Sequence, residues 1–105
     1  MDNISFAERL TKLRMAKNVS AREMSFAIGL SANYINKIEN KKTLPSMMTF
    51  FYICEYLNIS QQEFFDENNE NPEQLKQLVA DLKKLDEKAL THITGIVKII
   101  LEKNL

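Results

Sequence analysis

Apolar residues recur at intervals of three and four along most of this 105-residue chain, which is the spacing of one face of an α-helix. In the first such segment, residues 5–17, the apolar side is formed by Phe6, Leu10, Leu13 and Met15. The opposite side carries Arg9, Lys12 and Lys17. The pattern therefore predicts an amphipathic first helix with a basic outer side.

Two helix starts and one glycine break lie within residues 20–40. Ser20 and Glu23 stand three residues apart at the head of an apolar run, where each side chain can bond to the other's backbone N–H. Gly29 follows that run and can end a helix with a positive φ at no steric cost. Ser31 precedes the next run and is expected to cap it. The stretch predicts a helix, a tight turn and a second helix.

The second of these helices has two different sides. Ile35 and Ile38 share an apolar side that is expected to face the core. The other side carries the small, amide or cationic residues Ala32, Asn33, Asn36 and Lys37. Amides can pair with adenine, lysine can donate to guanine and alanine can contact a thymine methyl group. A solvated helix face is usually polar in any protein, so the pattern alone leaves both interpretations open.

The following segments complete an apolar core. Pro45 prevents helix continuation, and Ser46 is expected to cap a fourth helix over residues 47–57. That helix is apolar on most sides, which predicts burial, through Met48, Phe50, Phe51, Ile53, Cys54 and Leu57. Ser60 and Glu63 repeat the capping-box spacing before a short fifth helix. We expect this helix to close the core with Phe64 and Phe65.

An acidic and amide-rich stretch over residues 66–71 then predicts a linker or exposed turn. Pro72 suits the first position of a sixth helix, and a seventh is expected to begin after Asp86. The sixth helix has one apolar stripe, formed by Leu75, Leu78, Val79, Leu82 and Leu85. The seventh is apolar over much more of its surface, through Ala89, Leu90, Ile93, Ile96, Val97, Ile99, Ile100 and Leu101.

A hairpin of residues 72–105 is shorter than about 40 residues, the length below which an isolated chain usually needs extra stabilisation. Part of its apolar surface therefore needs a partner, either a second copy or the chain's own N-terminal domain. We favour a homodimer through the C-terminal helices. The expected interface consists of Leu90, Ile93, Ile96, Val97, Ile99, Ile100 and Leu101.

A family resemblance is carried by residues 20–40, SAREMSFAIGLSANYINKIEN, continued by KKTLPS over 41–46 and ISQQEFF over 59–65. These residues resemble the Cro/C1 (XRE-type) helix-turn-helix family of DNA-binding regulators. The matching positions, which fall in register together, are Gly29, Ser31, Ile35, Ile38, Glu39, Asn40 and Pro45. The resemblance implies an all-α fold, with a five-helix lambda-repressor-like domain followed here by the two-helix C-terminal hairpin. We expect the domain at 1–66, a linker at 67–71 and the hairpin at 72–105.

The resemblance also implies roles for particular residues. Those expected to read bases in a major groove are Ala32, Asn33, Asn36 and Lys37. Those expected to hold phosphates are Ser20, Arg22, Ser31, Tyr34, Asn40, Lys41, Lys42 and Thr43. The family has an arginine that pairs with the glutamate of its Glu-Asn motif, which implies a structural ion pair between Arg14 and Glu39.

Three positions depart from the family's pattern. Ala21 stands where a phosphate-binding glutamine is common, and Ala32 opens the reading face where longer side chains are common. Lys41 stands where the family often has glycine. If the backbone there has a positive φ, lysine bears roughly 1 kcal/mol or more of strain.

Composition narrows the function classes only slightly. Fourteen basic and fourteen acidic residues give a net charge of zero and a pI of about 6.6, which counts mildly against a nucleic-acid ligand. Local clustering of Lys37, Lys41 and Lys42 beside the reading helix offsets this, because phosphate binding depends on where cations lie. Only two glycines and two prolines occur, which favours an all-α chain.

The chain offers little for catalysis or for metal binding. Its one histidine, His92, has no Cys, Asp or Glu at zinc-ligand spacing, and no phosphate-binding glycine loop or nucleophile motif occurs. We expect no enzyme activity, no metal and no cofactor. The single Cys54 permits no intrachain disulfide, and neither a secretory signal nor an apolar span of about 18 residues is present. The expected compartment is the cytoplasm, with no membrane association.

The sequence thus predicts a sequence-specific regulator of transcription that binds double-stranded DNA, most simply a repressor that binds a two-fold symmetric operator as a homodimer. The alternative is a protein-interaction module, of the antitoxin or anti-repressor type, that uses the same fold without reading DNA. The sequence identifies no operator, target gene or small-molecule effector.

Overall fold

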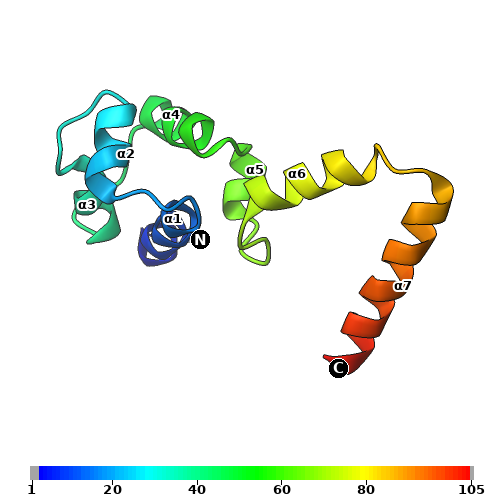
Figure 1. Ribbon diagram of the computed structural model, residues 1–105. Helices are drawn as coiled ribbons and strands as arrows, with labels where there is room; N and C mark the ends of the chain where they lie inside the picture. The colour runs from blue at the N-terminus through cyan, green and yellow to red at the C-terminus, as the bar shows by residue number, and fades with distance from the viewer. Residues whose placement is uncertain (1–2, 105) are drawn as a thin grey trace. The chain divides into compact units, whose positions relative to one another are not determined.

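A computed structural model of the protein describes residues 3–104, with side chains from Ser5 onward. Over these residues the chain is all-helical, as predicted, and it divides into two compact units, residues 1–73 and 74–105. The helices are α1 (Asn3–Ala16), α2 (Ala21–Ala27), α3 (Tyr34–Glu39), α4 (Met47–Leu57), α5 (Gln61–Phe65), α6 (Pro72–Leu82) and α7 (Glu87–Lys103) (Figure 1).

Four helices, α2, α4, α5 and α7, begin where the capping residues predict. Ser20 with Glu23, and Ser60 with Glu63, form complete capping boxes at the starts of α2 and α5. The Ser46 hydroxyl accepts from the Thr49 N–H at the start of α4, and the Asp86 carboxylate accepts from the Ala89 N–H at the start of α7. Each cap satisfies a backbone donor that has no partner inside its helix.

The core of the N-terminal unit lies between α1 and the four helices that follow it. Its buried members are Leu10, Leu13, Met24, Ile35, Ile38, Phe50, Ile53, Cys54, Leu57, Ile59 and Phe64. Phe6 packs against this core, with ring centroids 4.8 Å from Phe64 and 5.7 Å from Phe50. This aromatic cluster joins the first helix to the fourth and fifth.

Arg9 is not on a basic outer side of α1, and that expectation was wrong. Its side chain is 3% exposed, and its guanidinium donates to the backbone carbonyls of Phe64 and Glu63. These carbonyls belong to the last turn of α5, where the regular helical bonds end, and the Glu63 carbonyl also accepts from the N–H of the C-cap residue Asp66. Arg9 therefore serves the end of α5, and burial lowers its pKa. Met15, expected on the apolar side, is 61% exposed.

The fourth helix has the predicted bounds, but it is not buried on most sides. Only the face made by Phe50, Ile53, Cys54 and Leu57 is buried. The opposite face is exposed and still apolar, with Met47, Met48, Phe51 and Tyr52. Phe65 is also about half exposed, so Phe64 closes the core without it. A domain this small cannot surround a helix on every side.

The first turn of α6 belongs to the N-terminal unit. Pro72 is fully buried, and the Lys17 Nζ lies 3.3 Å from the Glu73 Oε2. The same lysine lies over the Tyr56 ring, 5.3 Å from its centroid. The unit thus continues past residues 67–71 and ends inside α6.

The C-terminal unit differs from a packed hairpin. Its two helices do not pack along one another, and every side chain described from Gln74 onward is exposed or half-buried. The sequence predicts the helices themselves and their apolar faces, but they do not form the packed hairpin that we expected over residues 72–105.

Candidate nucleic-acid interface

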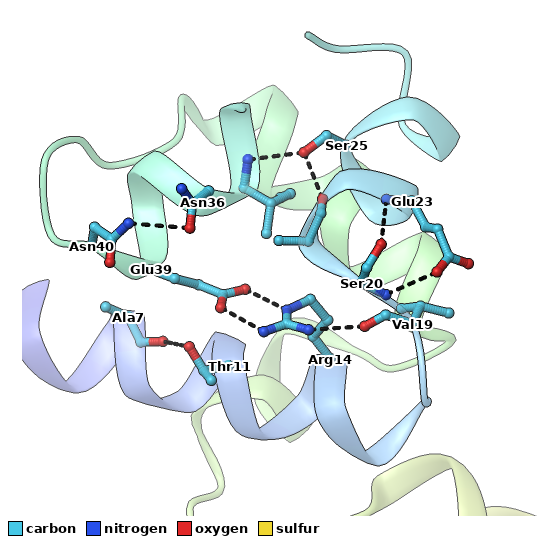
Figure 2. A network of polar contacts seen from close by, with 12 residues as sticks. Ala7, Thr11, Arg14, Val19, Ser20, Glu23, Ser25, Asn36, Glu39 and Asn40 are labelled. Carbon is cyan, nitrogen blue, oxygen red and sulfur yellow. Dashed lines mark hydrogen bonds and ion pairs between the residues drawn. The ribbon is translucent and has the colours of Figure 1, made fainter. Parts of the chain in front are cut away.

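One buried serine joins the two helices of the motif. The Ser25 hydroxyl donates to the Ala21 carbonyl within α2, at 2.8 Å, and accepts from the Ile35 N–H of α3 at 3.0 Å (Figure 2). Ser25 is fully buried. Because Gly29 has φ of +80°, the chain turns tightly between the helices and brings these groups together.

This serine also explains a correction to the start of α3. The helix begins at Tyr34, with Asn33 as its N-cap, so Ser31 does not cap it as expected. The Tyr34 N–H bonds to the Ser31 backbone carbonyl, and the next N–H, that of Ile35, is satisfied by Ser25 of α2. The cap of α3 therefore comes from the neighbouring helix. As a consequence, Ala32 and Asn33 lie in the preceding turn.

We predict that Ser25→Ala lowers the free energy of unfolding by about 2 kcal/mol, because the Ile35 N–H would remain buried without an acceptor. Chemical denaturation of the full chain measures this. Ser31→Ala is the matched control, since its hydroxyl is exposed and caps no helix. Equal midpoints for Ser25→Ala and the parent would contradict the role given to this serine.

The outward side of α3 and its preceding turn is free in the N-terminal unit. Asn33, Asn36 and Lys37 are exposed, Ala32 is half-buried, and Ile35 and Ile38 are buried on the opposite side. The Asn40 side-chain N–H donates to the Asn36 side-chain oxygen at 3.1 Å (Figure 2). That bond fixes the Asn36 amide and leaves its NH₂ group able to donate outward.

A bidentate ion pair holds α3 at a fixed angle to α1. The Arg14 Nε and Nη2 donate to the two carboxylate oxygens of Glu39, at 2.7 and 2.9 Å (Figure 2). The third contact of Arg14, from Nη1 to the Val19 carbonyl at 2.9 Å, ties in the chain entering α2. Hydrogen bonding to Glu39 raises the pKa of Arg14. The pairing is the one that the family resemblance implies.

The expected phosphate-contacting residues lie around this face. Tyr34 packs partly against the core. The others are exposed: Ser20, Arg22, Ser31, Asn40, Lys41, Lys42 and Thr43. Four of them already have local side-chain contacts, including Asn40 with the Asn36 side chain and Thr43 with the Leu44 carbonyl. The Ser20 hydroxyl accepts from the Glu23 N–H, and the Arg22 guanidinium lies 5.3 Å from the Phe26 ring centroid. The lysine pair at 41 and 42 follows Asn40, the C-cap of α3.

Lys41 has φ of +63°, so this lysine bears the backbone strain that the sequence predicts for a positive φ. We predict that Lys41→Gly raises the free energy of unfolding by about 1 kcal/mol while weakening DNA binding through the loss of a cation. Lys42→Gly, at a neighbouring position without a positive φ, should weaken binding without that gain. A Lys41→Gly protein less stable than the parent would contradict this reading.

Over residues 3–104, no group of three potential metal ligands comes together, and no helix has the length and apolar character needed to cross a bilayer. His92 is exposed on α7. Cys54 is a buried free thiol, and burial raises its pKa to about 11. It is a core residue, as predicted.

The fold and this face define a helix-turn-helix protein, and the comparisons with known proteins agree. A family model described as a helix-turn-helix domain matches residues 7–70. The crystal structure of the restriction-modification controller protein C.AhdI from Aeromonas hydrophila is similar with a TM-score of 0.58 and 30% identity, over 61% of this chain and 93% of that one. No curated protein matches the chain.

The chain belongs to the Cro/C1 (XRE-type) helix-turn-helix family of DNA-binding transcription regulators.

Proposed function

We propose that this protein is a repressor that binds a two-fold symmetric DNA operator as a homodimer. The observation that carries the proposal is the exposed side of α3, which two buried or part-buried contacts hold in place, one from Ser25 and one from Arg14. A rigid, uncovered helix of this kind can enter a major groove without first rearranging. The similarity to a restriction-modification controller supports a role in transcriptional control.

The proposed contacts with DNA are of two kinds, those with base edges and those with phosphates. Base edges would be read by Ala32, Asn33, Asn36 and Lys37, and the surrounding exposed cations and hydroxyls would hold phosphates. Because Ala32 and Asn33 precede α3, their backbone can also approach the DNA. In a dimer, the two copies of α3 would lie about 34 Å apart, one turn of the duplex.

The proposed dimer forms through the apolar surface of α7. Its exposed members include Leu90, Ile93, Ile96, Val97, Ile99, Ile100 and Leu101. Sedimentation analysis at micromolar concentration, with and without operator DNA, tests this directly. A protein that stays monomeric on DNA would refute the dimer.

Asn36→Ala should relax sequence preference at one position of each half-site by about 1 to 3 kcal/mol. Lys42→Ala is its control and should weaken all sequences alike, because a phosphate contact carries no base information. Binding to a panel of oligonucleotides with single base changes measures both variants. Indistinguishable preferences for Asn36→Ala and the parent would remove Asn36 from the reading set.

The second candidate is a protein-interaction module of the antitoxin or anti-repressor type. The zero net charge of the chain and the missing glutamine at Ala21 favour it. Salt dependence separates the two functions. With six or more phosphate contacts, affinity for DNA should fall roughly 10³-fold or more between 50 and 200 mM salt, whereas a protein partner that contacts the apolar face of α7 should be much less sensitive.

A further inference from the structure

The C-terminal unit, residues 74–105, has no core of its own over the residues described. Its exposed apolar side chains occur on both helices and in the turn: Leu75, Leu78, Val79, Leu85, Leu90, Ile93, Ile96, Val97, Ile99, Ile100 and Leu101. α6 and α7 do not pack along one another. A segment of this size does not keep two helices folded while both apolar faces remain in water. Another surface must therefore supply its core.

The size of this apolar surface matches a protein interface. Burying a Leu, Ile or Val side chain completely removes about 60 to 120 Å² of apolar area, and these side chains are about half exposed. Together they offer roughly 500 Å² of apolar area per chain. A standard interface of about 800 Å² per partner, about 65% apolar at its core, needs about the same amount.

The shape of α7 requires two covering surfaces. Counted at about 100° per residue, its apolar positions span about 200° of the helix circumference, roughly twice a usual core-facing stripe. One helix cannot cover that arc. α6 is also shorter, with 11 residues against 17 in α7, so it would leave the second half of α7 bare. α7 therefore needs one α6 and one further apolar helix.

We propose that a second copy of the chain completes this unit, with α6 of each copy packed against α7 of the other and the two α7 helices in contact. The inference rests on the homodimer proposed above and specifies which helices meet. A second copy provides both missing surfaces at once, an α6 stripe and an α7 arc. The core of the N-terminal unit, which includes Phe64 and Ile38, is complete without any residue of α7.

Cross-linking between paired cysteines distinguishes two arrangements. In the exchanged dimer α6 packs against α7 of the partner, whereas in a dimer of closed hairpins α6 packs against α7 of its own chain. Leu75 and Ile93 lie at nearly equal distances along the chain from the connecting residues 83–86, so they should face each other wherever α6 meets α7 in an antiparallel arrangement. Leu75→Cys and Ile93→Cys would be placed on two full-length chains with tags of different size, co-expressed, and treated with a short bismaleimide. Cys54 is buried with a raised pKa and should not react at neutral pH.

From the co-expressed chains we expect a covalent product that contains both tags. A single chain that carries both Leu75→Cys and Ile93→Cys should likewise form covalent dimers. Ala80→Cys in place of Leu75→Cys is the control, because Ala80 lies on the side of α6 opposite the stripe. A double-cysteine chain that cross-links only within itself would overturn the exchange while leaving the homodimer intact. Absence of any α6 to α7 cross-link in a dimer would also overturn it. Monomers in sedimentation would refute the homodimer itself.

Discussion

Replacing Arg14 with alanine should lower the free energy of unfolding by about 3 kcal/mol, because Glu39 would keep a part-buried charge without its partner. The side chains are only 16% and 10% exposed, so solvent screens this pair weakly. For a domain of this size, the loss corresponds to a fall in Tm of roughly 12 to 24 °C. Thermal unfolding of the full chain, followed by circular dichroism, measures it.

Two further variants identify the cause. Lys12→Ala removes an exposed cation from the same helix and should change Tm little. Arg14→Lys keeps the charge but loses the bidentate geometry, so it should fall between the parent and Arg14→Ala. An Arg14→Ala protein that melts with the parent would refute the pairing. Below its melting temperature, Arg14→Ala should also bind operator more weakly, because the angle of α3 is less fixed.

Charges placed on the apolar surface of α7 should separate the proposed dimer. With Ile96→Glu and Ile100→Glu together, two carboxylates on each copy would have to be buried in the interface, at a cost that prevents association. The variant should sediment as a monomer at micromolar concentration. Its affinity for a two-half-site operator should fall by about 10² to 10⁴-fold, the usual gain from linking two binding sites.

The matched control makes the same change in net charge on the polar side of α7, with Thr91→Glu and Lys98→Gln. These positions are exposed and lie outside the apolar arc. The control should remain dimeric and bind operator with nearly the parent's affinity. If both variants lose dimerisation and operator affinity to the same extent, the added charge and not the lost contact explains the loss. The dimer surface would then lie elsewhere on the chain.

Much of the fold could be predicted because local chemistry determined it. Ser20 with Glu23 and Ser60 with Glu63 satisfy backbone donors within their own helices, so spacing alone located those helix starts. The family resemblance supplied the pairing of Arg14 with Glu39, which lie 25 residues apart in sequence. Periodicity could not have matched those two charges.

The contacts that the sequence did not reveal depend on tertiary neighbours. Arg9 reads as a surface charge by periodicity, and only the position of the end of α5 shows why it is buried. Ser25 lies within an apolar helix face, and a serine in that place is itself a signal of a specific acceptor or donor role. Its partner Ile35 belongs to the next helix, so the true start of α3 could not be found from Ser31.

The central claim is that the exposed side of α3 reads duplex DNA. The most direct test is to select bound sequences from a random oligonucleotide pool and then footprint the enriched sequence with hydroxyl radicals. We expect two inverted copies of one short sequence, with protected segments centred about 10 base pairs apart on one face of the duplex. If Asn36→Ala loses protection at the base pair where it also loses sequence preference, α3 lies at that base pair. A pool that yields no enriched sequence at low salt would contradict the account.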